Sequence, residues 1–233
     1  MELLRKKMIE EVEDKIGVAF ENKNLLDVAL THSSYTNHKK NVKYNERLEF
    51  LGDAVLELSI SQFLFKKYPS KTEGELTKIR ALIVCENSLH SVAQKWQLGE
   101  HINMGKGEEL TGGRTRVSIL SDCVEAIIAA VYLEKGFEEA KNFVIRILDE
   151  NIIKAVRNEI ILDYKTKLQE KLQKNGEVNI SYDLIGYDGP PHRRKFFMQV
   201  FVNDKTFGKG EGYSKKEAEQ NAAKEALCMI GGE

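Results

Sequence analysis

The spacing of apolar residues changes once along this chain, near residue 160, and that change limits the folds open to it. Before it, nearly every apolar run has the three-to-four-residue spacing of an amphipathic helix. After it, residues 180–187 and 195–202 alternate apolar and polar side chains, as half-buried strands do. We therefore expect a helical domain followed by a smaller domain that contains a sheet.

The helical part contains clear helix boundaries. Amphipathic helices are predicted at residues 20–32, 88–98 and 117–136. Thr72, with Glu75 three residues later, forms a capping box that predicts a helix start. Gly136 is a typical helix end. The glycine-rich segment 104–116 predicts a loop.

The last part of the chain reads as a small domain of the order α-β-β-β-α. A helix over 163–176 ends at Gly176, and residues 205–213 form a third short strand after the two alternating segments. An alanine-rich helix over 214–230 follows, with Ser214 as its N-cap. Both helices are expected on one face of a three-stranded meander. The predicted domains span residues 1–157 and 162–231.

Composition excludes several classes of protein. The longest uncharged apolar run, residues 126–133, is far below the roughly 20 residues that a membrane helix needs. The first fifteen residues contain no apolar signal-peptide core. The cysteines are widely spaced and odd in number: Cys85, Cys123 and Cys228. We therefore expect a cytoplasmic protein without a disulfide framework. The net charge of −1 means that any binding of a polyanion depends on local clusters.

Carboxylates interrupt two apolar helical segments. Glu46, Glu49 and Asp53 share one helix face, at a cost in repulsion, and Gly52 adds a further cost within the helix. Gly52 would let another helix or a partner approach closely.

A second acidic pair, Asp122 and Glu125, lies on another apolar helix, and Glu73 stands at the predicted capping-box turn. Clustered carboxylates suit Mg²⁺ or Mn²⁺. Spacing alone leaves open the alternative of solvated helix faces, because it does not bring the two helices together.

Several segments together resemble one family. They are "LTHSSY" (30–35), "NERLEFLGDAVL" (45–56), "EGELTKIRALIV" (73–84), "GKGEE" (105–109), "GGRTRVSILSDCVEAIIAAVYL" (112–133) and "DYKTKLQE" (163–170). In this order they resemble ribonuclease III, and most closely its short bacterial members. The resemblance covers nearly the whole chain. It implies an all-α nuclease domain followed by a small α+β (α-β-β-β-α) double-stranded-RNA-binding domain.

The resemblance also implies roles for the acidic residues. The Mg²⁺ ligands, with Mn²⁺ able to substitute, would be Glu49, Asp53, Asp122 and Glu125. Asp53 and Glu125 would be catalytic, together with Glu46 and Glu73. The last two have less direct roles: water-mediated metal contact, RNA positioning or subunit contact.

Three other positions in the nuclease part bear on the resemblance. Phe50 matches a phenylalanine that inserts into a socket on the partner of a two-fold homodimer, and its alternative is an ordinary core position. Ser33 and Ser121 depart from the family pattern without removing a ligand. His32 is expected to be structural.

RNA contacts are implied in the second domain. They are Thr166, Gln169, Glu170, His192, Arg193, Ser214, Lys215 and Lys216. Lysines at a helix N-terminus, where backbone N–H groups are free, suit a phosphate. The first helix and the turn that carries His192 would read the shape of A-form RNA across its minor groove. The alternatives are a capped helix with solvated lysines at the start of the last helix and an ordinary surface turn at His192.

The expected function is Mg²⁺-dependent hydrolysis of both strands of double-stranded RNA. Products would have 5′-phosphate and 3′-hydroxyl ends, and the substrates would include ribosomal and other RNA precursors. One rival is a double-stranded-RNA-binding regulator that does not cleave, which the intact carboxylate set disfavours. Another is a phosphohydrolase of small nucleotides, which the RNA-binding domain disfavours.

Overall fold

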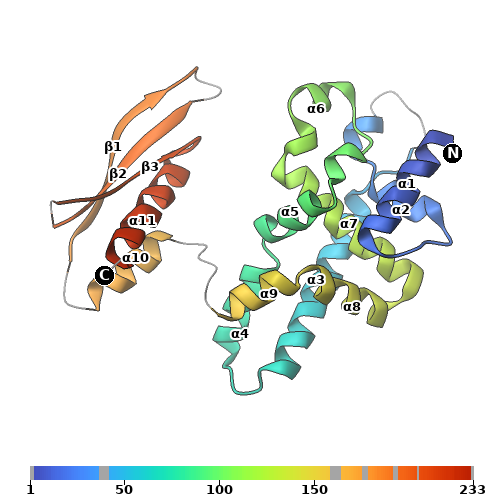
Figure 1. Ribbon diagram of the computed structural model, residues 1–233, viewed down its shortest axis with the longest axis horizontal. Helices are drawn as coiled ribbons and strands as arrows, with labels where there is room; N and C mark the ends of the chain where they lie inside the picture. The colour runs from blue at the N-terminus through green and yellow to red at the C-terminus, as the bar shows by residue number, and fades with distance from the viewer. Residues whose placement is uncertain are drawn as a thin grey trace. The chain divides into compact units, whose positions relative to one another are not determined.

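The chain divides into two compact units in a computed structural model, a first unit over residues 1–160 and a second over 161–233 (Figure 1). The structure describes residues 3–36, 42–157, 164–174, 178–190, 194–203 and 205–231. The boundary predicted between residues 157 and 162 therefore falls largely outside the described residues. No helix in the described part of the chain is long and apolar enough to cross a lipid bilayer.

The described first unit is helical. Its α-helices are α1 (Leu3–Ile16), α2 (Lys23–Ala29), α3 (Glu46–Lys67), α4 (Glu73–Ile83), α5 (Glu86–Lys95), α6 (Lys106–Leu110), α7 (Val117–Lys135), α8 (Phe137–Ile147) and α9 (Asp149–Val156). Three 3₁₀ turns accompany them: η1 (Ser33–Thr36), η2 (Leu98–Glu100) and η3 (Gly113–Thr115). The core surrounds α3 and α7, where Leu56, Ile60, Ile127 and Ile128 are fully buried.

Local signals set most helix ends as predicted. The capping box of Thr72 and Glu75 is present at the start of α4, and Gly136 ends α7 at a φ of 83°. The loop predicted over 104–116 is wrong, because α6 and η3 occupy it. Gly105 is the N-cap of α6, and two glutamates in the first turn favour that short helix.

The second unit is an antiparallel sheet of order β1-β2-β3 with helices on one face. Its described elements are α10 (Tyr164–Gln173), β1 (Ile180–Asp188), β2 (Lys195–Val202), β3 (Lys205–Gly212) and α11 (Lys215–Gly231). Leu168 of α10 and Ala222 of α11 pack with Val200 of β2 in one buried cluster. The predicted α-β-β-β-α meander is therefore confirmed, although the predicted helix end at Gly176 lies outside the described residues.

Candidate active site

Helices α3 and α7 touch at Gly52, and this contact brings their acidic residues together. A Cβ atom on Gly52 would lie 1.9 Å from the backbone carbonyl oxygen of Glu125. Since no side chain fits there, only glycine lets the two backbones approach this closely. The prediction that Gly52 serves a close approach is confirmed, and the approach is made by a helix of the same chain.

Carboxylates from both helices influence one another across this contact. The pKa of Glu125 is raised to about 8, first by burial and then by three neighbouring carboxylates. These belong to Asp53, Asp122 and Glu49. Burial, followed by the charges of Glu49 and Glu86, raises the pKa of Asp122 to about 6. The four carboxylates predicted as metal ligands are therefore neighbours in space.

The acidic residues of α3 differ in exposure. Glu49 is half-buried, and burial raises its pKa, with further contributions from the charges of Glu46 and Asp53. Glu46, in the first turn of α3, is exposed, as is Asp53. The acidic cluster therefore extends from a half-buried centre at α7 to an exposed rim at the start of α3.

Among the described residues, this cluster has no positive partner. The carboxylates of Glu49, Asp53, Asp122 and Glu125 form no ion pair or hydrogen bond with other described residues. Nor, within the described ranges, do three histidine, cysteine, aspartate or glutamate side chains converge closely enough to hold a metal ion. The four carboxylates therefore lie near one another without converging on one point.

Glu73 lies apart from this cluster. It begins α4, and its carboxylate accepts a 3.0 Å hydrogen bond from the Thr77 hydroxyl. With Lys66 it lines a groove that runs along α3 from Leu58 to Tyr68. Lys66 lies about 20 Å along that helix from Asp53 by helical rise. The other predicted acidic residues are therefore not neighbours of Glu73 within this chain.

An apolar stripe runs along another part of α3. Phe50 is 81% exposed. Leu58 and Phe65, which lie further along the same face of the helix, are 54% and 74% exposed. Leu58 and Phe65 also line the groove between α3 and α4, whose volume is 850 Å³. The alternative that Phe50 is an ordinary core residue is therefore wrong.

In the second unit, three of the predicted RNA-contact residues share one concave surface. Thr166, Gln169 and Lys216 line a groove of 610 Å³ between α10, β1 and the start of α11. Glu170 and Lys215 are exposed on the same two helices. This arrangement leaves room for an extended ligand along α10 and the α11 N-terminus.

Of the remaining predicted RNA contacts of the second unit, the structure describes Ser214 only. The Ser214 hydroxyl accepts a 3.1 Å hydrogen bond from the backbone N–H of Glu217, which confirms it as the N-cap of α11. His192 and Arg193 lie outside the described residues.

Sequence patterns did not reveal every neighbour of these sites. Glu86, the first residue of α5, contributes to the raised pKa of Asp122. The Ser121 hydroxyl donates to the Glu86 carbonyl at 3.0 Å, which holds the start of α5 against α7. In the sequence Glu86 looks like any first-turn glutamate, so only the fold reveals it. Lys165 and Tyr182, which line the groove of the second unit, gave no signal either.

Comparisons with known proteins match this arrangement. A "Ribonuclease-III-like" family model matches residues 22–156, and a "Double-stranded RNA binding motif" matches residues 164–230. A curated "Ribonuclease 3" of Clostridium acetobutylicum is 62% identical over 95% of this chain and 96% of its own length. The "Ribonuclease 3" of Clostridium perfringens is also 62% identical, over 95% of this chain and 93% of its own.

A solved structure agrees with the fold of the first unit. The nuclease domain of ribonuclease III from Campylobacter jejuni is 47% identical, with a TM-score of 0.58. That match covers 61% of this chain and 97% of the Campylobacter chain. Family models, curated relatives and fold thus agree, and the chain belongs to the ribonuclease III family of double-stranded-RNA endoribonucleases.

Proposed function

We propose that this endoribonuclease works with Mg²⁺, for which Mn²⁺ can substitute, held by Glu49, Asp53, Asp122 and Glu125. The observation that carries the proposal is the contact at Gly52, which gathers these carboxylates without a positive partner among the described residues. Carboxylate oxygens are the ligands that Mg²⁺ prefers. Crowded carboxylates with raised pKa values, as at Glu125, are what a divalent cation would relieve.

Each helix would present its two ligands about one turn apart, and both helices are anchored in the core. Bound Mg²⁺ supplies positive charge at the scissile phosphate and makes water a better nucleophile. Asp53 and Glu125 would act directly, while Glu46 would position RNA or water. Hydrolysis adds the water oxygen to phosphorus, and a proton goes to the O3′ leaving group. The products would therefore carry 5′-phosphate and 3′-hydroxyl ends.

The second domain, which we place at residues 162–231 after a nuclease domain at 1–157, would hold the duplex. Thr166, Gln169 and Glu170 would contact ribose 2′-hydroxyls from α10. Ser214, Lys215 and Lys216 would bind phosphate at the start of α11. His192 and Arg193 would reach a second stretch of minor groove.

A homodimer would supply a site for each strand. Two-fold pairing of the exposed Phe50, Leu58 and Phe65 would bury a stripe that water otherwise covers. The 850 Å³ groove beside it would receive an aromatic ring from the partner. Consistent with this, the Campylobacter jejuni structure is described as having flexibility in a region involved in dimer formation. Glu73, on the rim of this groove, would then act at the subunit contact.

Phe50→Ala tests the dimer. Because the side chain is 81% exposed, its loss leaves the core of the monomer intact. Truncating a buried interface anchor costs about 2 kcal/mol or more, so the dissociation constant of the dimer should rise by at least about 30-fold. Sedimentation equilibrium measures this, with Leu110→Ala as the control, since Leu110 is exposed on α6. An unchanged dimer affinity in the Phe50 variant would refute the interface.

The cleavage assay decides between the proposal and its rivals. A long labelled RNA duplex should be cut on both strands only when Mg²⁺ or Mn²⁺ is added, and the new 5′ ends should be sensitive to phosphatase. Retention of the duplex uncut, with binding intact, would favour a regulator that does not cleave. We further propose that the enzyme acts in the cytoplasm on precursors of ribosomal and other RNAs, which sequencing of the 5′ ends in a depleted strain would test.

A further inference from the structure

Residues 103–116, called here the bridging segment, connect the starts of the two acidic helices. On the α3 side, the backbone N–H of Asn45, the N-cap of α3, donates to the Thr31 carbonyl at 2.9 Å. Thr31 in turn pairs with Asn103 in an isolated parallel bridge. Asn103, the first residue of the bridging segment, is thus connected to the start of α3 through the backbone contacts of Thr31.

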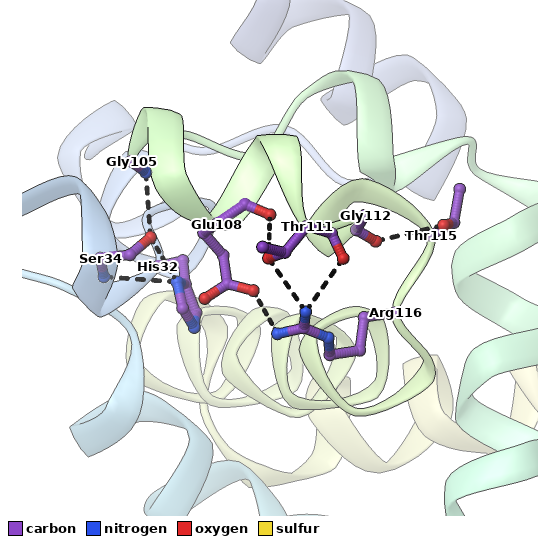
Figure 2. Close-up of polar contacts among 8 residues, drawn as sticks. All are labelled: His32, Ser34, Gly105, Glu108, Thr111, Gly112, Thr115 and Arg116. Atoms are coloured by element: carbon purple, nitrogen blue, oxygen red, sulfur yellow. Dashed lines mark hydrogen bonds and ion pairs between the residues drawn. The ribbon is translucent and has the colours of Figure 1, made fainter. Parts of the chain in front are cut away.

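The next contact of this segment is made at Gly105 (Figure 2). Its backbone N–H donates to the Ser34 hydroxyl at 2.9 Å, and that hydroxyl lies 2.8 Å from Nδ1 of His32. A Cβ atom on Gly105 would lie 2.5 Å from the Ser34 carbonyl oxygen, so a larger residue would push the segments apart. Ser34 of η1 and the start of α6 are therefore held in direct contact.

The α7 side is closed by Arg116, the N-cap of that helix (Figure 2). Its guanidinium forms an ion pair with Glu108 of α6 and donates to the carbonyl and hydroxyl of Thr111, at 3.3 and 3.2 Å. The Thr111 hydroxyl also donates to the Glu108 carbonyl at 3.0 Å. Gly113 permits this packing, because a Cβ atom there would lie 2.8 Å from both the Glu108 Cγ and its carbonyl oxygen.

Helix α7 depends on this contact more than most helices would. Its N-cap side chain makes no capping hydrogen bond, and its first turn contains no acidic residue. An arginine at a helix N-terminus is unfavourable because that end carries partial positive charge. Glu108 neutralises this cation and brings a carboxylate to the helix start. The exposed pair therefore has a role that isolated surface ion pairs lack.

We propose that Glu108, Thr111 and Arg116 form a positioning unit for the active site. They fix the start of α7, about 9 Å along the helix from Asp122, relative to the segment that leads into α3. This holds Asp122 and Glu125 beside the carboxylates of α3 against mutual repulsion before metal binds. The three residues act through the helix and touch neither RNA nor metal. The inference rests on the proposed metal site.

The test is metal binding by RNA-free protein. Calorimetric titration of Mn²⁺ into Arg116→Ala should give a dissociation constant about tenfold weaker than that of the parent, at the low end of effects for residues that orient ligands. The Mg²⁺ concentration for half-maximal cleavage should rise by a similar factor, while cleavage at saturating Mg²⁺ recovers. Lys95→Ala is the control, since the Lys95–Glu150 ion pair is also exposed but joins α5 to α9. It should bind Mn²⁺ as the parent does.

Charge reversal distinguishes positioning from general damage. Glu108→Arg combined with Arg116→Glu should bind Mn²⁺ more tightly than either single variant, because the pair is restored in reverse. If circular dichroism shows Arg116→Ala to be unfolded, Glu108→Gln decides instead, since it keeps the shape and removes the charge. Mn²⁺ affinity within twofold of the parent in a folded variant, or no rescue by reversal, overturns the inference alone. A parent protein that binds no divalent cation overturns the proposed function as well.

Discussion

The proposed functional side chains lie on core-forming helices in the first unit and on the exposed surface in the second. In the first unit, the carboxylates belong to α3 and α7, whose other faces form the buried core. In the second, the proposed RNA contacts that the structure describes are exposed residues on α10 and at the start of α11. Chemistry and folding are therefore coupled in the first unit. In the second, Lys215 and Lys216 can be removed without touching the cluster around Val200 and Ala222.

The strongest test of this coupling is Gly52→Ala. The added methyl would meet the Glu125 backbone at 1.9 Å, and a backbone carbonyl cannot rotate away as a side chain can. We expect destabilisation of about 1–3 kcal/mol or more, with a greater loss of cleavage than any single carboxylate change causes. Thermal unfolding and single-turnover cleavage measure the two effects.

Gly74→Ala is the matched control for Gly52→Ala. Gly74 is also helical, in α4, and a Cβ atom there meets nothing within 4 Å. The control should unfold and cleave as the parent does. Parent-like stability and cleavage in Gly52→Ala would show that the two helices can separate without consequence.

Glu125→Gln separates charge from packing within the first unit. It keeps the size of the side chain and removes one charge of the cluster, so cleavage should fall by about 10²–10³. Binding of the duplex should persist, since the proposed RNA contacts lie in the other unit. Gel shift and single-turnover cleavage of one labelled duplex measure both. Cleavage within tenfold of the parent would contradict a metal-ligand role for Glu125.

In the second unit, Lys215→Ala with Lys216→Ala should change binding alone. The plot of log affinity against log salt should flatten by about one unit for each phosphate that the variant no longer neutralises. Cleavage at saturating RNA and the melting temperature should stay near parent values. Lys209→Ala, on β3, is the control. An unchanged slope in the double variant would mean that the first unit binds most of the phosphates.

The smallest effect expected is a pH dependence of stability in metal-free protein. The pKa of Glu125 is about 8 in the folded protein against 4.5 for an ordinary glutamate, and the pKa of Asp122 shifts in the same direction, from 3.8 to about 6. The folded state therefore binds these protons more tightly. Their contribution to stability is complete below the unfolded pKa values and is lost as pH rises through the folded ones.

Thermal unfolding in EDTA should show this as a melting temperature that falls by roughly a few °C between pH 5 and 8. Mg²⁺ should remove the fall, and Glu125→Gln should reduce it because the larger of the two shifts is gone. A metal-free melting temperature that rises over this range in the parent, and equally in the variant, would contradict the direction expected from the two raised pKa values.

Features set by neighbouring residues could be predicted from the sequence. Strand β2 occupies residues 195–202 as the alternation indicated, and Ser214 caps α11. The prediction for residues 104–116 was wrong because a contact with the distant Ser34 and an ion pair with Arg116 at the end of the segment support α6, and glycine content reveals neither. The predicted helix over 20–32 is shorter in the structure, ending at Ala29 before Thr31 pairs with Asn103.

The candidate site divides in the same way. Spacing alone predicted that Glu49 and Asp53 share a face of one helix, but their meeting with α7 was implied by family resemblance. Gly52 was the one local sign of that contact, since a glycine inside a helix calls for a reason. Glu86 gave no sign, because its proximity to Asp122 exists only once α5 and α7 have packed.

The contact between α3 and α7 also affects how the chain can fold during synthesis. Helix α7 begins at Val117, about 50 residues after α3 ends at Lys67. At about 5–20 residues per second, the apolar face of α3 leaves the ribosome several seconds before its main partner exists. The hairpins of the second unit, by contrast, pair strands adjacent in sequence and close at once. Folding of the first unit therefore has to wait for its later helices, whereas the sheet of the second unit does not wait for a distant strand.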